Sequence, residues 1–202
     1  MRRAWRVVAV QLIVFTLGSV VMGFEMLASR YLYPYFGGSI ETWGALIATV
    51  LAALMLGYFV GGYLVDRFPD LRIAALLVAI AAGWIAAVRE GSGIVLPFLL
   101  ETMGDGAVVT IMGSAMLLFL PLALLGTLLP FVIRVIISDV WHTGRVTGIT
   151  YAVSTMGNIF GTLYVTFGLI PIMGVRSITG LIALTAAAGA VGLYLLRNVA
   201  KD

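Results

Sequence analysis

The sequence contains six apolar runs that are almost free of charged residues. A helix needs about 20 apolar residues to cross the ~30 Å hydrocarbon core of a bilayer. A shorter apolar piece at 94–100 is expected to lie at the membrane interface or to re-enter the membrane. The six runs predict a single all-α membrane domain over residues 1–202, with transmembrane helices at about 7–29, 42–65, 73–88, 107–133, 146–170 and 178–196.

Composition excludes the other broad classes of protein. Of the 202 residues, 62% are hydrophobic and 10% are charged, whereas a soluble domain carries about 25% charged residues. The mean hydropathy is +1.13. These values exclude a soluble enzyme, a disordered chain and a nucleic-acid binder. The absence of cysteine excludes a disulfide scaffold and a thiolate metal site.

The positions of the basic residues predict the orientation. Basic residues collect in cytoplasmic loops, and an even number of spans places both termini on one side. With the termini inside, the outer side holds Arg30, Arg89 and Arg176. The cytoplasmic side then holds Arg2, Arg3, Arg6, Arg67, Arg72, Arg134, Arg145, Arg197 and Lys201. We therefore expect a multi-pass protein of the inner (plasma) membrane with cytoplasmic termini.

Glu25 is an acidic residue inside a predicted span. A carboxylate at membrane depth is costly unless it is solvated or paired. Gln11, Gly18, Met22, Glu25 and Ser29 follow one another at steps of three, four or seven, so they share one helix face. That face is expected to look into the bundle, where Glu25 would hold a cation or a proton. The alternative is a structural ion pair, with Arg30 as the partner.

The fifth predicted span carries a second polar stripe, with Asn158 near its middle. The stripe consists of Tyr151, Ser154, Thr155, Asn158, Thr162 and Thr166. Such residues either join helices by hydrogen bonds or line a substrate cavity. Tyr151 and Asn158 are the preferred binding candidates.

Two further patterns concern packing and the outer end of the bundle. The pairs Gly57/Gly61 and Gly157/Gly161 are small-residue motifs typical of close helix approach, within the chain or in a dimer. An aromatic group that includes Trp43 is expected at the outer interface. It is either an aromatic belt or a site that captures an organic cation by cation–π contact.

No catalytic motif occurs in the sequence. It contains no P-loop, no glycine-rich dinucleotide loop and no H-E-x-x-H. His142 has no partner at the spacing of a metal site. We expect a chain that is not an enzyme and binds neither a metal nor a cofactor.

The stretch Gly57–Arg67, GYFVGGYLVDR, resembles the signature between the second and third helices of the major facilitator superfamily. In that signature small residues allow close packing, and an acid–base pair controls the cytoplasmic ends of the helices. The resemblance implies a gating role for Asp66 and Arg67. It also implies half of a twelve-helix transporter, built from two inverted three-helix repeats.

A second resemblance extends over roughly residues 20–196 and concerns spermidine-synthase-like membrane proteins. It rests on EMLASR at 25–30, PYFGGS at 34–39, Trp43, GTLLP at 126–130, YAVSTMGNIFG at 151–161 and LIPIMG at 169–174. In that family a membrane domain is often fused to an aminopropyltransferase-like domain. The nucleotide loop and catalytic acid of that domain are missing from these 202 residues, so the resemblance does not imply aminopropyl transfer here.

Together these features favour a membrane transporter of a small organic cation, polyamine-like, acting as a homodimer of half-facilitator protomers. Glu25, Tyr151, Asn158 and Trp43 would bind the substrate, and Arg30 would lie at the mouth or pair with Glu25. The alternative is a membrane anchor for a separate, soluble aminopropyltransferase-like protein. A third, less favoured hypothesis is a subunit of a membrane enzyme that handles lipid or quinone.

Overall fold

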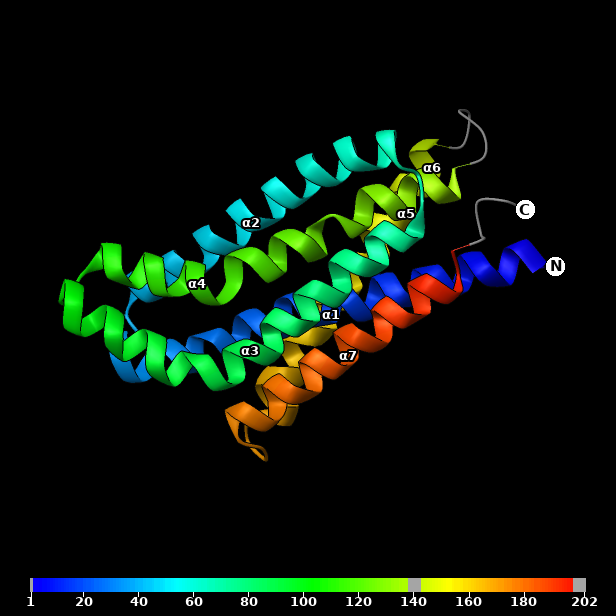
Figure 1. The fold of residues 1–202 in the computed structure, drawn as a ribbon. Helices are drawn as coiled ribbons and strands as arrows, with labels where there is room; N and C mark the ends of the chain where they lie inside the picture. The colour runs from blue at the N-terminus through cyan, green and yellow to red at the C-terminus, as the bar shows by residue number, and fades with distance from the viewer. Residues whose placement is uncertain (1, 138–142, 198–202) are drawn as a thin grey trace.

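The computed structural model describes residues 2–137 and 143–197, and these residues are almost entirely helical (Figure 1). No strand occurs within these ranges. The elements are α1 (Arg2–Phe36), α2 (Ile40–Arg67), α3 (Leu71–Met103), α4 (Ala107–Gly126), α5 (Leu128–Ile136), α6 (Thr143–Leu163), the π-helical segment η2 (Tyr164–Leu169) and α7 (Val175–Leu195). The all-α prediction is confirmed.

Five helical segments are long and apolar enough to cross a membrane. They are Trp5–Phe36, Ile40–Arg67, Leu71–Met103, Ala107–Ile136 and Val175–Leu195. The predicted fifth span, 146–170, coincides with α6 and η2 but is not among them. Its helix contains the polar stripe around Asn158, which lowers its hydropathy. The chain is an all-α protein with the features of a multi-pass membrane protein, and the sixth crossing stays a prediction.

The third helix corrects the predicted boundaries. The predicted span 73–88 and the short piece 94–100 are both parts of α3, a continuous helix of 33 residues. The weak helix formers around Gly91 do not end it, because Ser92, Leu96 and Leu99 are buried against neighbouring helices. Tertiary packing therefore overrides local propensity, and 94–100 is part of a continuous helix and not a separate short segment.

The predicted span 107–133 is divided near its end. Helix α4 ends at Gly126 and α5 begins at Leu128. Pro130 has no N–H to donate to the carbonyl of Gly126, four residues earlier, so the helical ladder is interrupted there. At the same break the hydroxyl of Thr127 donates to the carbonyl of Leu124 at 2.7 Å. Pro121, by contrast, lies inside α4 without ending it.

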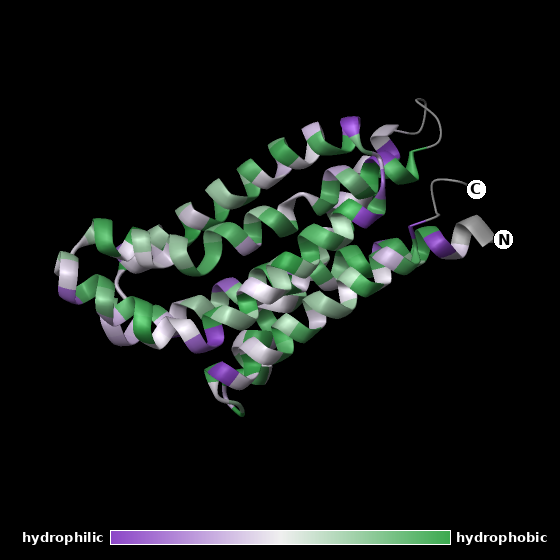
Figure 2. Cartoon of the chain, viewed as in Figure 1, coloured by the Kyte–Doolittle hydropathy of each residue, from purple (hydrophilic) through white to green (hydrophobic). Residues whose placement is uncertain are grey.

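Three helix pairs make the most extensive contacts: α1 with α6, α2 with α4, and α3 with α7. Figure 1 shows the start of α1 and the end of α7 at the same end of the bundle. Polar residues gather toward the helix ends and the turns, and the middle of the bundle is apolar (Figure 2). Large apolar side chains on the outside remain exposed, including Phe59 at 77% and Leu184 at 69%. Such a surface suits a lipid environment, because the acyl chains of lipids are as apolar as these side chains.

Candidate functional site

A small cavity lies at the centre of the bundle, between α1, α2, the α4–α5 segment and α6. It is lined by Val14, Leu17, Gly18, Val21, Leu54, Tyr58, Leu125, Gly126, Leu128, Leu129, Ser154 and Asn158. Three of these residues, Tyr58, Ser154 and Asn158, bring polar groups into an otherwise apolar wall. The cavity measures about 30 Å³, which is enough space for water. In this conformation it is too small for an organic substrate.

Glycines allow α1 and α6 to approach closely beside this cavity. A Cβ atom on Gly18 would lie 2.5 Å from the carbonyl oxygen of Ser154 and 3.1 Å from Oδ1 of Asn158. On the other helix, a Cβ on Gly157 would collide with the carbonyl oxygen of Phe15, and one on Gly161 with that of Ser19. The side chain of Asn158 is thus held against the backbone of α1, at the middle of both helices.

The second small-residue motif works in the same way between α2 and the α4–α5 segment. A Cβ on Gly57 would collide with the carbonyl oxygen of Ala123, and one on Gly61 would lie 2.7 Å from Cα of Thr127. Within the described structure both motifs are therefore used for packing inside one chain.

A wider hollow lies where α1 ends and α2 begins. It is lined by Met26, Ser29, Arg30, Tyr33, Gly37, Gly38, Thr42, Trp43, Thr166 and Ile170, and it measures about 280 Å³. We call it the vestibule. Arg30 and Trp43 both line the vestibule, which agrees with their predicted position at the mouth of a transport pathway. The guanidinium of Arg30 makes this hollow a less favourable entrance for a cation than the aromatic residues alone.

Glu25 is buried, with 6% of its surface exposed, and it lines neither the central cavity nor the vestibule. It lies seven residues after Gly18, about 10 Å along the helix. Among the described residues no ion pair joins Glu25 to Arg30, and Arg30 is exposed. The structure therefore gives no support to the ion-pair alternative.

The rest of the predicted Glu25 face also lies against neighbouring elements. The amide nitrogen of Gln11 donates to the hydroxyl of Thr150 on α6 at 2.9 Å. Gly18 borders the central cavity and Ser29 borders the vestibule. One face of α1 thus connects the two hollows, with Glu25 between them.

The predicted residues of α6 are separated by the structure. Asn158 lines the central cavity, whereas Tyr151 is 43% exposed and lines none of the cavities described above. Tyr58 is the polar cavity residue that was not singled out from the sequence. The sequence feature that points to Tyr58 is its position directly after Gly57, the first residue of a packing motif.

Asp66 and Arg67, the predicted gating pair, end α2 and are both exposed. Within residues 2–137 and 143–197 neither forms an ion pair. The guanidinium of Arg67 lies 5.9 Å from the ring centroid of Phe68. Their gating role stays a prediction.

The described residues contain no group of three His, Asp or Glu side chains placed to hold a metal ion. His142 lies outside the described residues.

No protein-family model, curated protein or solved structure matches this chain. The candidate site therefore stands on its own geometry: a polar point at the centre of the bundle, a vestibule at one end, and a buried acid between them.

Proposed function

We propose that this chain is a membrane transporter for a small organic cation, polyamine-like, and that it works as a homodimer of six-helix protomers. The observation that carries the proposal is the central cavity. Four helical segments far apart in the sequence meet there, and two of them supply polar groups: Tyr58 from α2, and Ser154 and Asn158 from α6. Polar groups inside a membrane bundle mark substrate or ion pathways.

The contact pattern supports two related three-helix halves. We count α4 and α5 as the fourth helix, α6 with η2 as the fifth, and α7 as the sixth. We then exchange the first helix with the fourth, the second with the fifth and the third with the sixth. This exchange converts the α1–α6 pair into the α2–α4 pair and leaves the α3–α7 pair unchanged. It also turns the α3–α4 pair into the α1–α7 pair, and both are extensive contacts in the structure. Such an exchange symmetry is what two repeats of three helices produce.

The glycine motifs follow the same exchange. Gly57 and Gly61 pack on the α4–α5 segment near Gly126, and Gly157 and Gly161 pack on α1 near Gly18. The two crossings therefore use equivalent helices and equivalent small residues. They meet at the central cavity, which both Gly18 and Gly126 line. A site at the junction of two repeats is the arrangement found in secondary transporters.

In this proposal the described conformation is occluded. A cavity of about 30 Å³ holds water and excludes a polyamine, so the α1–α6 and α2–α4 crossings must separate for a substrate to enter. Glu25 would then face the enlarged cavity and neutralise the cation, with Asn158 and Tyr151 as polar contacts and Trp43 at the vestibule. Asp66 and Arg67 would hold the opposite end closed. The chain itself performs no catalytic step.

A homodimer completes the pathway. Six helices are half of a twelve-helix transporter, and two parallel copies related by an axis along the membrane normal restore both halves. The inner (plasma) membrane, with both termini in the cytoplasm, is the proposed location.

One observation favours a second function, a membrane anchor for a separate aminopropyltransferase-like protein. That function needs no pathway, and it fits an acid that is buried and lines neither hollow, as Glu25 does. It predicts that a soluble enzyme of this class copurifies with the chain.

Uptake of radiolabelled spermidine into proteoliposomes separates the two functions. We expect uptake by the wild-type chain, at least a tenfold loss in Glu25→Gln and Asn158→Ala, and unchanged uptake in Glu41→Gln. Glu41 is the matched control, because it is an exposed acid on α2 that lines neither hollow. Absence of uptake, or uptake that is unchanged in Glu25→Gln, would overturn the transport proposal. Copurification of the enzyme would then establish the second function.

A further inference from the structure

A groove runs along the face between α3 and α7, at the end of the bundle where α3 begins and α7 ends. Its walls are Arg72, Ala75, Leu76 and Ala79 from α3, and Ala190, Val191 and Tyr194 from α7. The α3 residues follow one another at helical spacing, so they form one stripe. Alanine side chains end at Cβ, which leaves a hollow of about 350 Å³ between the two helices. The groove is apolar except at the Arg72 end.

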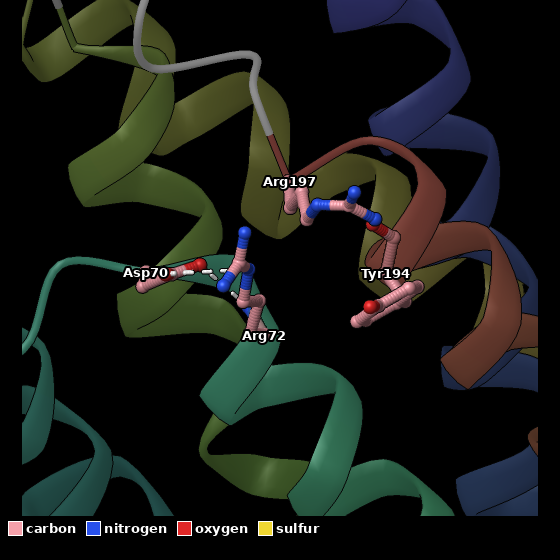
Figure 3. Close-up of polar contacts among 4 residues, drawn as sticks. All are labelled: Asp70, Arg72, Tyr194 and Arg197. Carbon is pink, nitrogen blue, oxygen red and sulfur yellow. Dashed lines mark hydrogen bonds and ion pairs between the residues drawn. The ribbon is translucent and has the colours of Figure 1, made fainter.

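Two arginines stand at that end. Arg72 lies in the first turn of α3, and its Nε is 3.8 Å from Oδ2 of Asp70. Arg197 follows α7, and its guanidinium lies 4.4 Å from the ring centroid of Tyr194. Figure 3 shows Arg72 beside Asp70 at the start of α3, and Arg197 with Tyr194 at the end of α7. The end of the groove is therefore a small basic cluster.

The positive charge of this cluster is incompletely balanced by the described residues. Asp70 is one carboxylate for two guanidinium groups, and its contact with Arg72 is long and exposed to solvent. Arg197 donates from Nη1 to the carbonyl oxygen of Tyr194 at 3.3 Å, but its buried Nε has no hydrogen-bond partner among the described residues. An anion with several acceptor oxygens would bind the accessible N–H groups of the two guanidinium groups.

The positions of Arg72 and Arg197 along α3 and α7 indicate which kind of anion would bind. Both α3 and α7 are long and apolar enough to span a membrane. From Arg72 to Arg89 of α3 is about 26 Å, and from Arg176 to Arg197 of α7 is about 32 Å, at 1.5 Å per residue. These lengths match the ~30 Å hydrocarbon core. Arg72 and Arg197 are therefore at headgroup level, and the alanine-lined groove runs from them into the hydrocarbon.

The size of the groove argues against a protein partner. Seven residues line it, whereas a stable protein interface uses about 20–30 residues on each side. One acyl chain is a narrow apolar rod, and it suits a hollow of this width.

We infer that the α3–α7 groove binds one anionic glycerophospholipid, with its phosphate on Arg72 and Arg197 and an acyl chain along Ala75, Ala79 and Ala190. Basic pockets between membrane helices recognise lipid headgroups in this way. The site is separate from the central cavity and does not depend on the transport proposal.

The test is native mass spectrometry of the delipidated, detergent-solubilised protein titrated with phosphatidylglycerol. We expect a single saturable lipid adduct. Its apparent affinity should fall about fivefold in Arg72→Gln and about twenty-fivefold in Arg72→Gln/Arg197→Gln, since each basic residue near an anionic lipid contributes about 1 kcal/mol, which is about a factor of five. Arg134→Gln is the matched control for charge, because Arg134 is an exposed arginine in the last turn of α5 and does not line the groove.

Two further arms separate the headgroup from the chain. Ala79→Leu fills the groove from an exposed position and should abolish the adduct, whereas Ala87→Leu, also exposed on α3 but outside the groove, should not. Inorganic phosphate at the same concentration should not displace the lipid. An adduct that is unchanged in the double arginine variant, or unchanged in Ala79→Leu, overturns the inference. Displacement of the lipid by inorganic phosphate also overturns it, because the site would then be one for a free anion.

Discussion

At the level of single residues, the described structure depends on glycines that let backbones touch. Gly157 and Gly161 leave no room for a Cβ against α1, and Gly57 and Gly61 leave none against the α4–α5 segment. Other glycines of the same helices, such as Gly62 of α2 and Gly148 of α6, have open space where a Cβ would be. The chain therefore contains its own controls for the effect of close approach.

We predict that Gly161→Ala destabilises the fold by about 1–3 kcal/mol, the usual cost of overpacking. The added methyl group meets the carbonyl oxygen of Ser19, which is backbone and cannot move aside. Gly148→Ala should instead stabilise the protein by about 0.5–1 kcal/mol, because alanine loses less entropy than glycine in a helix. Unfolding by SDS titration in mixed micelles measures both. Equal effects of the two substitutions would show that α1 and α6 do not touch at Gly161.

At the level of the elements, the number of membrane crossings depends on α6 and η2. Five other segments qualify as spans by length and composition, and α6 with η2 forms 27 further helical residues from Thr143 to Leu169. Its packing against α1 is as extensive as that of any pair in the structure. We therefore expect α6 to lie at the same membrane depth as α1.

We predict that the two ends of the α6–η2 segment lie on opposite sides of the membrane. The chain has no cysteine, so Arg145→Cys and Ile172→Cys, both at exposed positions, introduce single labelling sites. In right-side-out spheroplasts an impermeant maleimide should label Ile172→Cys, whereas Arg145→Cys should react only after lysis. Glu101→Cys, in the last turn of α3, should behave like Ile172→Cys. Labelling of Arg145→Cys and Ile172→Cys from the same side would remove the sixth crossing and with it the half-facilitator arrangement.

At the level of the whole molecule, the central cavity of the bundle measures only about 30 Å³, and apolar side chains are exposed on the outside. One copy therefore does not enclose a pathway wide enough for an organic cation. Transport by this chain needs a conformational opening, and in our proposal it also needs a second copy.

We predict a protein mass of twice 21.5 kDa for the particle in lipid nanodiscs, measured by light scattering with the lipid contribution subtracted. When wild type is coexpressed with Glu25→Gln, spermidine uptake should be lower than the uptake expected in proportion to the fraction of wild-type chains. The reason is that mixed dimers contain one defective half. A mass of 21.5 kDa in nanodiscs would contradict the homodimer, and uptake by that monomer would show that six helices suffice.

The solvent, the helical secondary structure and the small-residue motifs of this protein follow from its amino-acid sequence. Long apolar runs in a chain with 10% charged residues have one stable outcome, since backbone groups in lipid must be paired within a helix or a closed barrel. The steps of three, four and seven also indicated which residues of α1 share a face. These are local properties, and they can be calculated from residue spacing alone.

Where helices continue, and which polar residues meet, depends on contacts between distant parts of the chain. Packing of Ser92 and Leu96 extends α3 through a stretch that local propensity would interrupt, and the missing donor of Pro130 divides the fourth apolar run. Asn158 and Tyr58 lie a hundred positions apart and share a cavity, whereas Glu25 and Arg30 lie five apart and do not pair. Contacts between distant residues depend on how the helices cross, and the crossing is set by glycines on partner helices acting together. Spacing along one helix cannot show that.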